Sequence, residues 1–191
     1  MTIRISPLKL TVSVITIAAA SALFAGTAFA EFASDPLGDE FINGSLSISG
    51  AINEPLFAGH SVVPGDQDMT SVTVQNKGTL DLRYAVVSTT TEDTLAGRLE
   101  LSIWQADTGA ACASPTSRPL YGPAALGSVS GISIVGDPAQ GSQAGDRTLA
   151  AGAVETLCFK VSAPLSLDNS FQGLTTQPTF HFDAEQVDGN P

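Results

Sequence analysis

The residues from 64 to 87 constrain the fold of this chain more than any other stretch. They read PGDQDMTSVTVQNKGTLDLRYAVV, with turn-forming residues at 64–66 and again at 76–78. Between and after these turns, apolar residues alternate with polar ones, which is typical of strands that bury one face. The alternating apolar residues are Val72, Val74, Leu80, Leu82, Tyr84 and Val86. Such strands must bury that face against another layer, so we expect an all-β fold, a β-sandwich or a related two-layer structure.

The first 30 residues are organised like a secretory signal peptide. Two basic residues precede an apolar stretch from residue 10 to residue 24, and no acidic residue occurs before Glu31. Residues 28–30 read AFA and fit the small-x-small cleavage rule, so we expect cleavage between Ala30 and Glu31. An uncleaved anchor is the alternative, but the apolar stretch is shorter than the roughly 20 residues of a spanning helix. We therefore expect a secreted protein, extracellular or at the cell surface, with no stable membrane span after cleavage.

The charge of the remaining 161 residues limits the partners. The signal segment holds two of the eight Lys and Arg and none of the nineteen Asp and Glu, so the rest has a formal charge of −13. So acidic a surface argues against nucleic acid and anionic membranes as partners. It is compatible with calcium or a cationic matrix component, and equally with a role in solubility alone.

Cys112 and Cys158 are the two cysteines of the chain. In an exported protein two such cysteines are expected to form a disulfide, and this one would close a 46-residue separation. A metal-binding or nucleophilic pair is the alternative, which the absence of a CxxC spacing disfavours.

The organisation after the signal peptide (1–30) is an N-terminal arm (31–43) and one β domain (44–191) with an irregular Gly-rich insertion at about 105–145. We expect strands at 44–50, 56–63, on both sides of the 76–78 turn, and at 95–104, 132–135, 153–163 and 176–185. In the 153–163 strand, Leu157 and Phe159 share one face while Cys158 points the other way. The disulfide should therefore lie on the outer face of a sheet and tether the insertion.

Motifs for catalysis are absent from the sequence. There is no H-E-x-x-H, G-x-S-x-G or phosphate-binding loop. His181, Asp183 and Glu185 fall on one face of a strand, either as part of a metal site completed by a neighbouring strand or as the solvent face of an edge strand. We favour the solvent face, and expect no catalytic residue, no metal site and no cofactor.

The arm from residue 31 to residue 43 has spaced apolar residues but no clear strand pattern. These residues are Phe32, Leu37, Phe41 and Ile42. An arm of this kind can pair with a sheet edge of another subunit, and such a head-to-tail contact builds filaments. The alternative is that the arm folds back on its own domain or stays disordered.

Several segments, taken in order, resemble the TasA/CalY family of exported proteins from Gram-positive bacteria, which includes camelysin. The matching segments are FINGSLSI (41–48), PGD (64–66), VQNKGTLDLRYAV (74–86), LELSIW (99–104), LYG (120–122), ETLCFKVSAPL (155–165), NSFQG (169–173) and TFHFDAEQ (179–186).

The resemblance implies a jelly-roll-like antiparallel β-sandwich, processing by a dedicated signal peptidase, and assembly into extracellular biofilm matrix fibres. In the family's fibre arrangement, the N-terminal segment of one subunit completes the sheet of the next. The expected partners are copies of the chain itself, other matrix or accessory proteins, and the signal peptidase. Two alternatives are a camelysin-like cell-surface metalloprotease, for which this sequence has no zinc motif, and a surface binding module.

Overall fold

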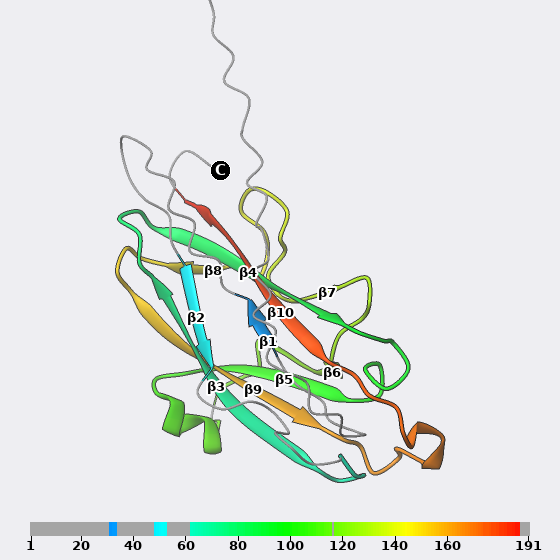
Figure 1. Ribbon diagram of the computed structural model, residues 1–191. Helices are drawn as coiled ribbons and strands as arrows, with labels where there is room; N and C mark the ends of the chain where they lie inside the picture. The colour runs from blue at the N-terminus through cyan, green and yellow to red at the C-terminus, as the bar shows by residue number, and fades with distance from the viewer. Residues whose placement is uncertain (1–30, 34–47, 53–61, 116, 188–191) are drawn as a thin grey trace, which may run out of the picture.

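The computed structural model describes residues 31–33, 48–52, 62–115 and 117–187, which form two five-stranded β-sheets (Figure 1). The elements are β1 (Glu31–Ala33), β2 (Ile48–Ile52), β3 (Gln67–Asn76), β4 (Leu82–Thr90), β5 (Glu100–Ala106), the 3-10 helix η1 (Gly109–Ala113), β6 (Tyr121–Ala125), β7 (Ile132–Val135), β8 (Arg147–Leu149), β9 (Val154–Ser162), the 3-10 helix η2 (Asn169–Phe171) and β10 (Pro178–Gln186). Among these residues no α-helix occurs, and the predicted all-β sandwich is confirmed.

The strand order defines two layers. In the first, which we call the β4 sheet, the order is β1–β10–β4–β7, with β8 also paired to β4. In the second, the β9 sheet, the order is β2–β3–β9–β5–β6. Neighbouring strands are antiparallel except β1 and β10, which are parallel.

The core lies between the two sheets and is formed by alternate residues of each long strand. Phe159 of β9 and Phe180 of β10 meet across the layers with their ring centroids 4.9 Å apart. The other fully buried large side chains include Val72, Leu82, Tyr84, Leu99, Leu101, Ile103, Leu126, Ile134 and Leu157. The apolar faces predicted from the period-two pattern are therefore the faces that the fold buries.

The turn at 76–78 connects the two sheets. β3 belongs to the β9 sheet and β4 to the β4 sheet, so the two runs face each other across the core and do not form a hairpin. Asn76 is fully buried and holds the crossing: its Nδ2 donates to the carbonyls of Leu80 (2.8 Å) and Leu149 (3.0 Å), and its Oδ1 accepts from the Gly78 amide (2.8 Å). The alternation identified the buried faces but could not tell a crossing from a hairpin.

The strand predicted at 95–104 begins later, at Glu100. The Glu92 carboxylate accepts hydrogen bonds from the amides of Thr94, Leu95 and Ala96, at 2.7, 2.9 and 3.0 Å. These bonds hold the chain in a turn before β5, while Leu95 still packs into the core. A side-chain cap thus replaces strand pairing over the first part of the predicted segment.

The insertion from 105 to 145 contains more regular structure than expected. β7 (Ile132–Val135) has the predicted bounds, but η1 and the edge strand β6 were not predicted. β6 reads YGPAA, and its glycine and proline are residues that disfavour a strand, so the sequence carries no strand signal. In the structure Gly122 has a φ of 74°. The pairing of β6 with β5 decides its conformation.

The remaining strands differ from the predictions at their ends. β2 is described over Ile48–Ile52, whereas residues 44–47 lie outside the described residues. The strand expected at 56–63 falls mostly outside them, and Val62 and Val63 are not in a strand. β9 and β10 match their predicted segments to within two residues at each end. In the described part of the chain, no helix is long and apolar enough to cross a membrane.

Candidate functional site

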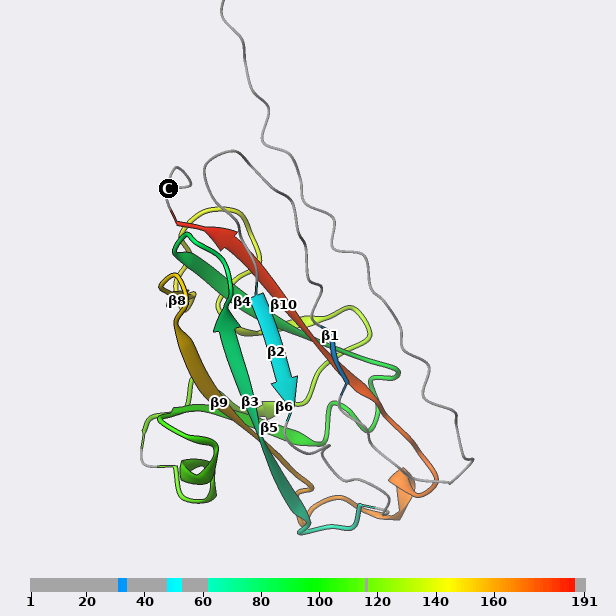
Figure 2. The same cartoon turned by 60° about the vertical axis from the view of Figure 1, so that its left-hand side comes forward.

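The edge of the β4 sheet beside β10 brings the predicted N-terminal segment onto the folded domain. β1 pairs in parallel with β10, with Glu31 opposite Thr179, Phe32 opposite Phe180 and Ala33 opposite His181 (Figures 1 and 2). The strand begins at the residue that follows the predicted cleavage point. Ala30, the last residue of the predicted signal peptide, lies outside the described residues. So do Leu37, Phe41 and Ile42 of the predicted arm.

β10 is anchored to the core along its inward face. Phe180 is fully buried, and Phe182 and Ala184 pack against the core cluster, with the Phe182 ring 6.0 Å from that of Tyr84. On its other side β10 pairs with β4 over its whole length, from Pro178 to Gln186. The strand that receives β1 is therefore held in place by the rest of the sandwich.

The outward face of β10 carries the three polar residues singled out in the sequence. His181 Nε2 and Thr89 Oγ1 share a hydrogen bond of 3.1 Å, and the Glu185 carboxylate accepts from Arg83 Nε and from the Gly141 amide. Burial raises the pKa of Asp183, against a smaller opposing effect of His181. All three residues point to one face as predicted. They are partly buried and β10 lies between β1 and β4, so the expected solvent face of an edge strand is wrong. The loop that carries Gly141 covers part of this face.

The described residues do not fit a zinc site. Catalytic zinc needs three convergent His, Asp, Glu or Cys ligands, and no group of three such residues that could hold a metal occurs in residues 62–115 and 117–187. His181 is bonded to Thr89, and Glu185 is engaged by Arg83 and Gly141. His60 lies outside the described residues.

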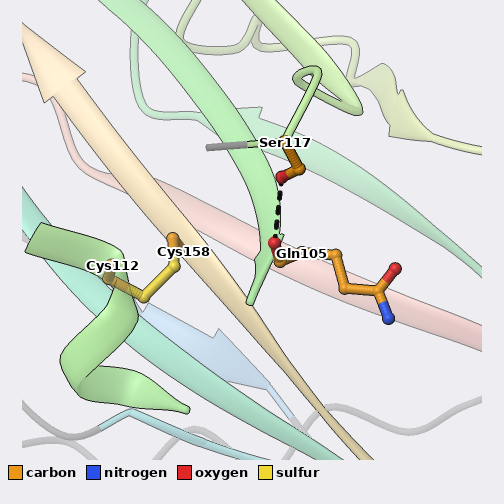
Figure 3. The surroundings of a disulfide bond; sticks show 4 residues. All are labelled: Gln105, Cys112, Ser117 and Cys158. Atoms are coloured by element: carbon orange, nitrogen blue, oxygen red, sulfur yellow. Dashed lines mark hydrogen bonds between the residues drawn. A yellow bond between two sulfur atoms is a disulfide. The ribbon is translucent and has the colours of Figure 1, made fainter. Parts of the chain in front are cut away.

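A disulfide joins Cys112 in η1 to Cys158 in β9, as Figure 3 shows, with the two Cα atoms 5.4 Å apart. Leu157 and Phe159, on either side of Cys158, belong to the core between the sheets. The bridge is therefore on the outer face of the β9 sheet and tethers the insertion.

A polar contact between the sheets was not predicted from the sequence. The Glu155 carboxylate accepts from Tyr84 Oη and from Arg147 Nη2 (2.6 Å), and Arg147 Nη2 also donates to Gln105 Oε1 (2.7 Å). Burial, with the neighbouring Glu155 charge, raises the pKa of Tyr84, so the phenol remains a donor. The position of Glu155 in the sequence could have indicated this contact. Glu155 shares its strand face with the buried Leu157, and a carboxylate on a buried face needs hydrogen-bonding or charged partners.

The sequence profile of the camelysin metallo-endopeptidase family matches residues 7–98. This match supports the assignment of the chain to the camelysin family. The family indicated by the ordered segments is thereby confirmed, and the match covers β1 to β4 together with the predicted signal segment.

Two further comparisons add nothing on function. No curated protein sequence matches this chain. A solved structure described as "AvmM Catalyzes Macrocyclization in Alchivemycin A Biosynthesis" is 12% identical, with 75% of this chain and 90% of that chain covered and a TM-score of 0.37.

Proposed function

We propose that this chain is an exported structural protein whose subunits join head to tail into extracellular biofilm matrix fibres. The observation that carries the proposal is the pairing of β1 with β10, because β1 starts at the predicted mature N-terminus. A terminal strand that pairs with its own sheet edge can pair with the same edge of another copy. Such a contact is not self-complementary, so it continues into a filament.

Family membership supports export. The family profile begins at residue 7, inside the predicted signal peptide, so that segment belongs to what the family shares. A cleaved leader would free Glu31 as the N-terminus and so release β1 from the segment before it. Signal peptidase is accordingly the proposed processing partner.

In the single chain, β1 pairs with β10 of its own subunit, which is the alternative to pairing with another copy. The intrachain and interchain arrangements use the same backbone positions on the acceptor strand. They therefore compete, and assembly requires β1 to leave its own sheet edge.

A cysteine pair in register across this edge distinguishes the two arrangements. Ala33→Cys combined with His181→Cys places the new thiols on adjacent strands, within the Cα separation of about 4.4–6.8 Å that a disulfide spans. After assembly and mild oxidation, we expect a ladder of covalent oligomers on a non-reducing gel. A covalently closed monomer as the sole product would show that β1 stays on its own subunit.

The control pair is Ala33→Cys with Gln186→Cys. Gln186 is exposed and lies five residues further along β10, about 16 Å from the acceptor position, so this pair should not crosslink. Deletion of residues 31–40 tests the same contact without cysteines. If the truncated protein stays folded and forms filaments as fast as the full mature chain, the arm is not the donor.

A metallo-endopeptidase is the second candidate, because the family is described by that activity. The pure protein would then cleave casein, and a chelator would stop the cleavage. Because the described donors do not fit a zinc site, we expect no chelator-sensitive cleavage. Chelator-sensitive cleavage that is abolished by His181→Ala would establish the enzyme instead.

A further inference from the structure

The Cys112–Cys158 disulfide lies apart from the core between the sheets. Cys158 points to the outer face of the β9 sheet, and η1 lies over this face against β3, β5 and β9 (Figure 3). The bond therefore connects a surface loop to the outside of the middle strand of the sheet.

The loop that carries η1 lies against β3, β5 and β9 but buries little of its own surface there. η1, whose five residues are all described, buries only Cys112, and Thr108 before it makes no side-chain capping bond. Further along, Ser117 Oγ donates an exposed hydrogen bond of 3.1 Å to the Gln105 carbonyl. A 3-10 segment this short is not stable alone, so its place on the sheet depends on the covalent bond together with its packing against β3, β5 and β9.

The area that η1 covers is small and central. Cys158 is completely buried, whereas Thr156 and Lys160, the next outward-pointing residues of β9, are only partly buried. Ser71 of β3 and Trp104 of β5 are in register with Cys158 on either side. Ser71 is also buried, although it points away from the core.

We propose that this disulfide is a thiol-exchange site that latches η1 onto the β9 sheet. Reduction by a dithiol, such as an exported enzyme with two active-site cysteines, releases η1 and the residues beside it, from 107 to 115. The outer face around Cys158, Ser71 and Trp104 is then uncovered. The sandwich itself remains folded, because its core residues lie on the opposite face of the sheet.

The exchange transfers two electrons from the dithiol to the bridge. One thiolate of the reductant attacks Cys112 Sγ, forms a mixed disulfide and expels Cys158 as a thiolate, which takes up a proton. The second thiol of the reductant then loses its proton and attacks the sulfur of the first, which releases Cys112 as a thiol and leaves the reductant as a disulfide. Both protein cysteines are buried, so the reductant reaches Cys112 Sγ through a local fluctuation of the chain around η1 while the bond is still intact.

Hydrogen exchange of the mature protein, before and after reduction with dithiothreitol, tests the latch. We expect amides between residues 107 and 115 to exchange about tenfold faster or more after reduction, as in a frayed segment, while β4 and β10 keep their protection. Cys158 should become reactive to an alkylating reagent. The fluorescence of Trp104, the single tryptophan, should change as its disulfide neighbour is lost.

The matched variant is Cys112→Ser with Cys158→Ser, which should show the open exchange pattern with or without dithiothreitol. Two results would overturn the proposal. Equal exchange of residues 107–115 in the oxidised and reduced proteins would show that the packing against β3, β5 and β9 holds the loop without the bond. Loss of protection in β4 and β10 together with the loop would show that the bond holds the whole fold.

Discussion

The partly buried carboxyl group of Asp183, on the outward face of β10, makes the stability of the fold depend on pH. Its pKa is raised by burial, so the folded state binds its proton more tightly than the unfolded chain, where Asp titrates near pH 3.9. Stability is therefore lost as the pH rises from about 4 through the folded-state pKa. Asp183→Asn should raise the melting temperature at neutral pH and leave it unchanged at about pH 3, as measured by thermal unfolding.

Asp168→Asn is the matched control, because the shift there has the opposite sign. Hydrogen bonds from the Ser170 hydroxyl and amide lower the pKa of Asp168. This group contributes stability above its unfolded-state pKa, which is lost as the pH falls through its folded-state pKa. Asp168→Asn should therefore lower the melting temperature at neutral pH. A shift of the same sign in both variants would contradict this account of Asp183.

At the scale of elements, the edge strand β6 depends on one glycine. A Cβ on Gly122 would lie 1.9 Å from the Leu101 carbonyl oxygen, and φ is 74°. Gly122→Ala should therefore separate β6 from β5 and cost more than the roughly 1–2 kcal/mol that a left-handed conformation alone imposes on alanine. Urea denaturation measures the difference in the free energy of unfolding.

Gly152→Ala isolates the backbone contribution. Gly152 has nearly the same φ, 73°, but no atom lies within 4 Å of its added Cβ. This variant should lose about 1–2 kcal/mol and no more. Equal losses in the two variants would mean that the close contact with Leu101 does not hold β6 in place.

At the scale of the whole molecule, charge opposes assembly. The chain after the predicted cleavage site has a formal charge of −13, and two of its arginines, Arg83 and Arg147, are already paired with carboxylates. Raising the ionic strength from about 0.01 M to about 1 M shortens the screening length from roughly 30 Å to roughly 3 Å. Filament formation, followed by light scattering, should therefore be faster at high salt. Slower assembly there would mean that attraction between charged groups drives the contact.

The local period of the sequence determined much of this fold. Val72 and Val74 of β3 and Leu157 and Phe159 of β9 are buried as the alternation predicts, because successive side chains of a strand point to opposite faces. The same parity predicted that Cys158 lies on the outer face of its sheet. These features depend only on residues that are close together in the sequence.

Only the tertiary structure decided which strands are neighbours. A crossing and a hairpin bury the same alternate residues, so the pattern could not place β3 and β4 in opposite sheets. β6 is a strand because β5 pairs with it, and Glu155 is tolerated among apolar residues because Tyr84 and Arg147 reach it from the other sheet. These contacts join residues far apart in the sequence, and a local pattern carries no information about them.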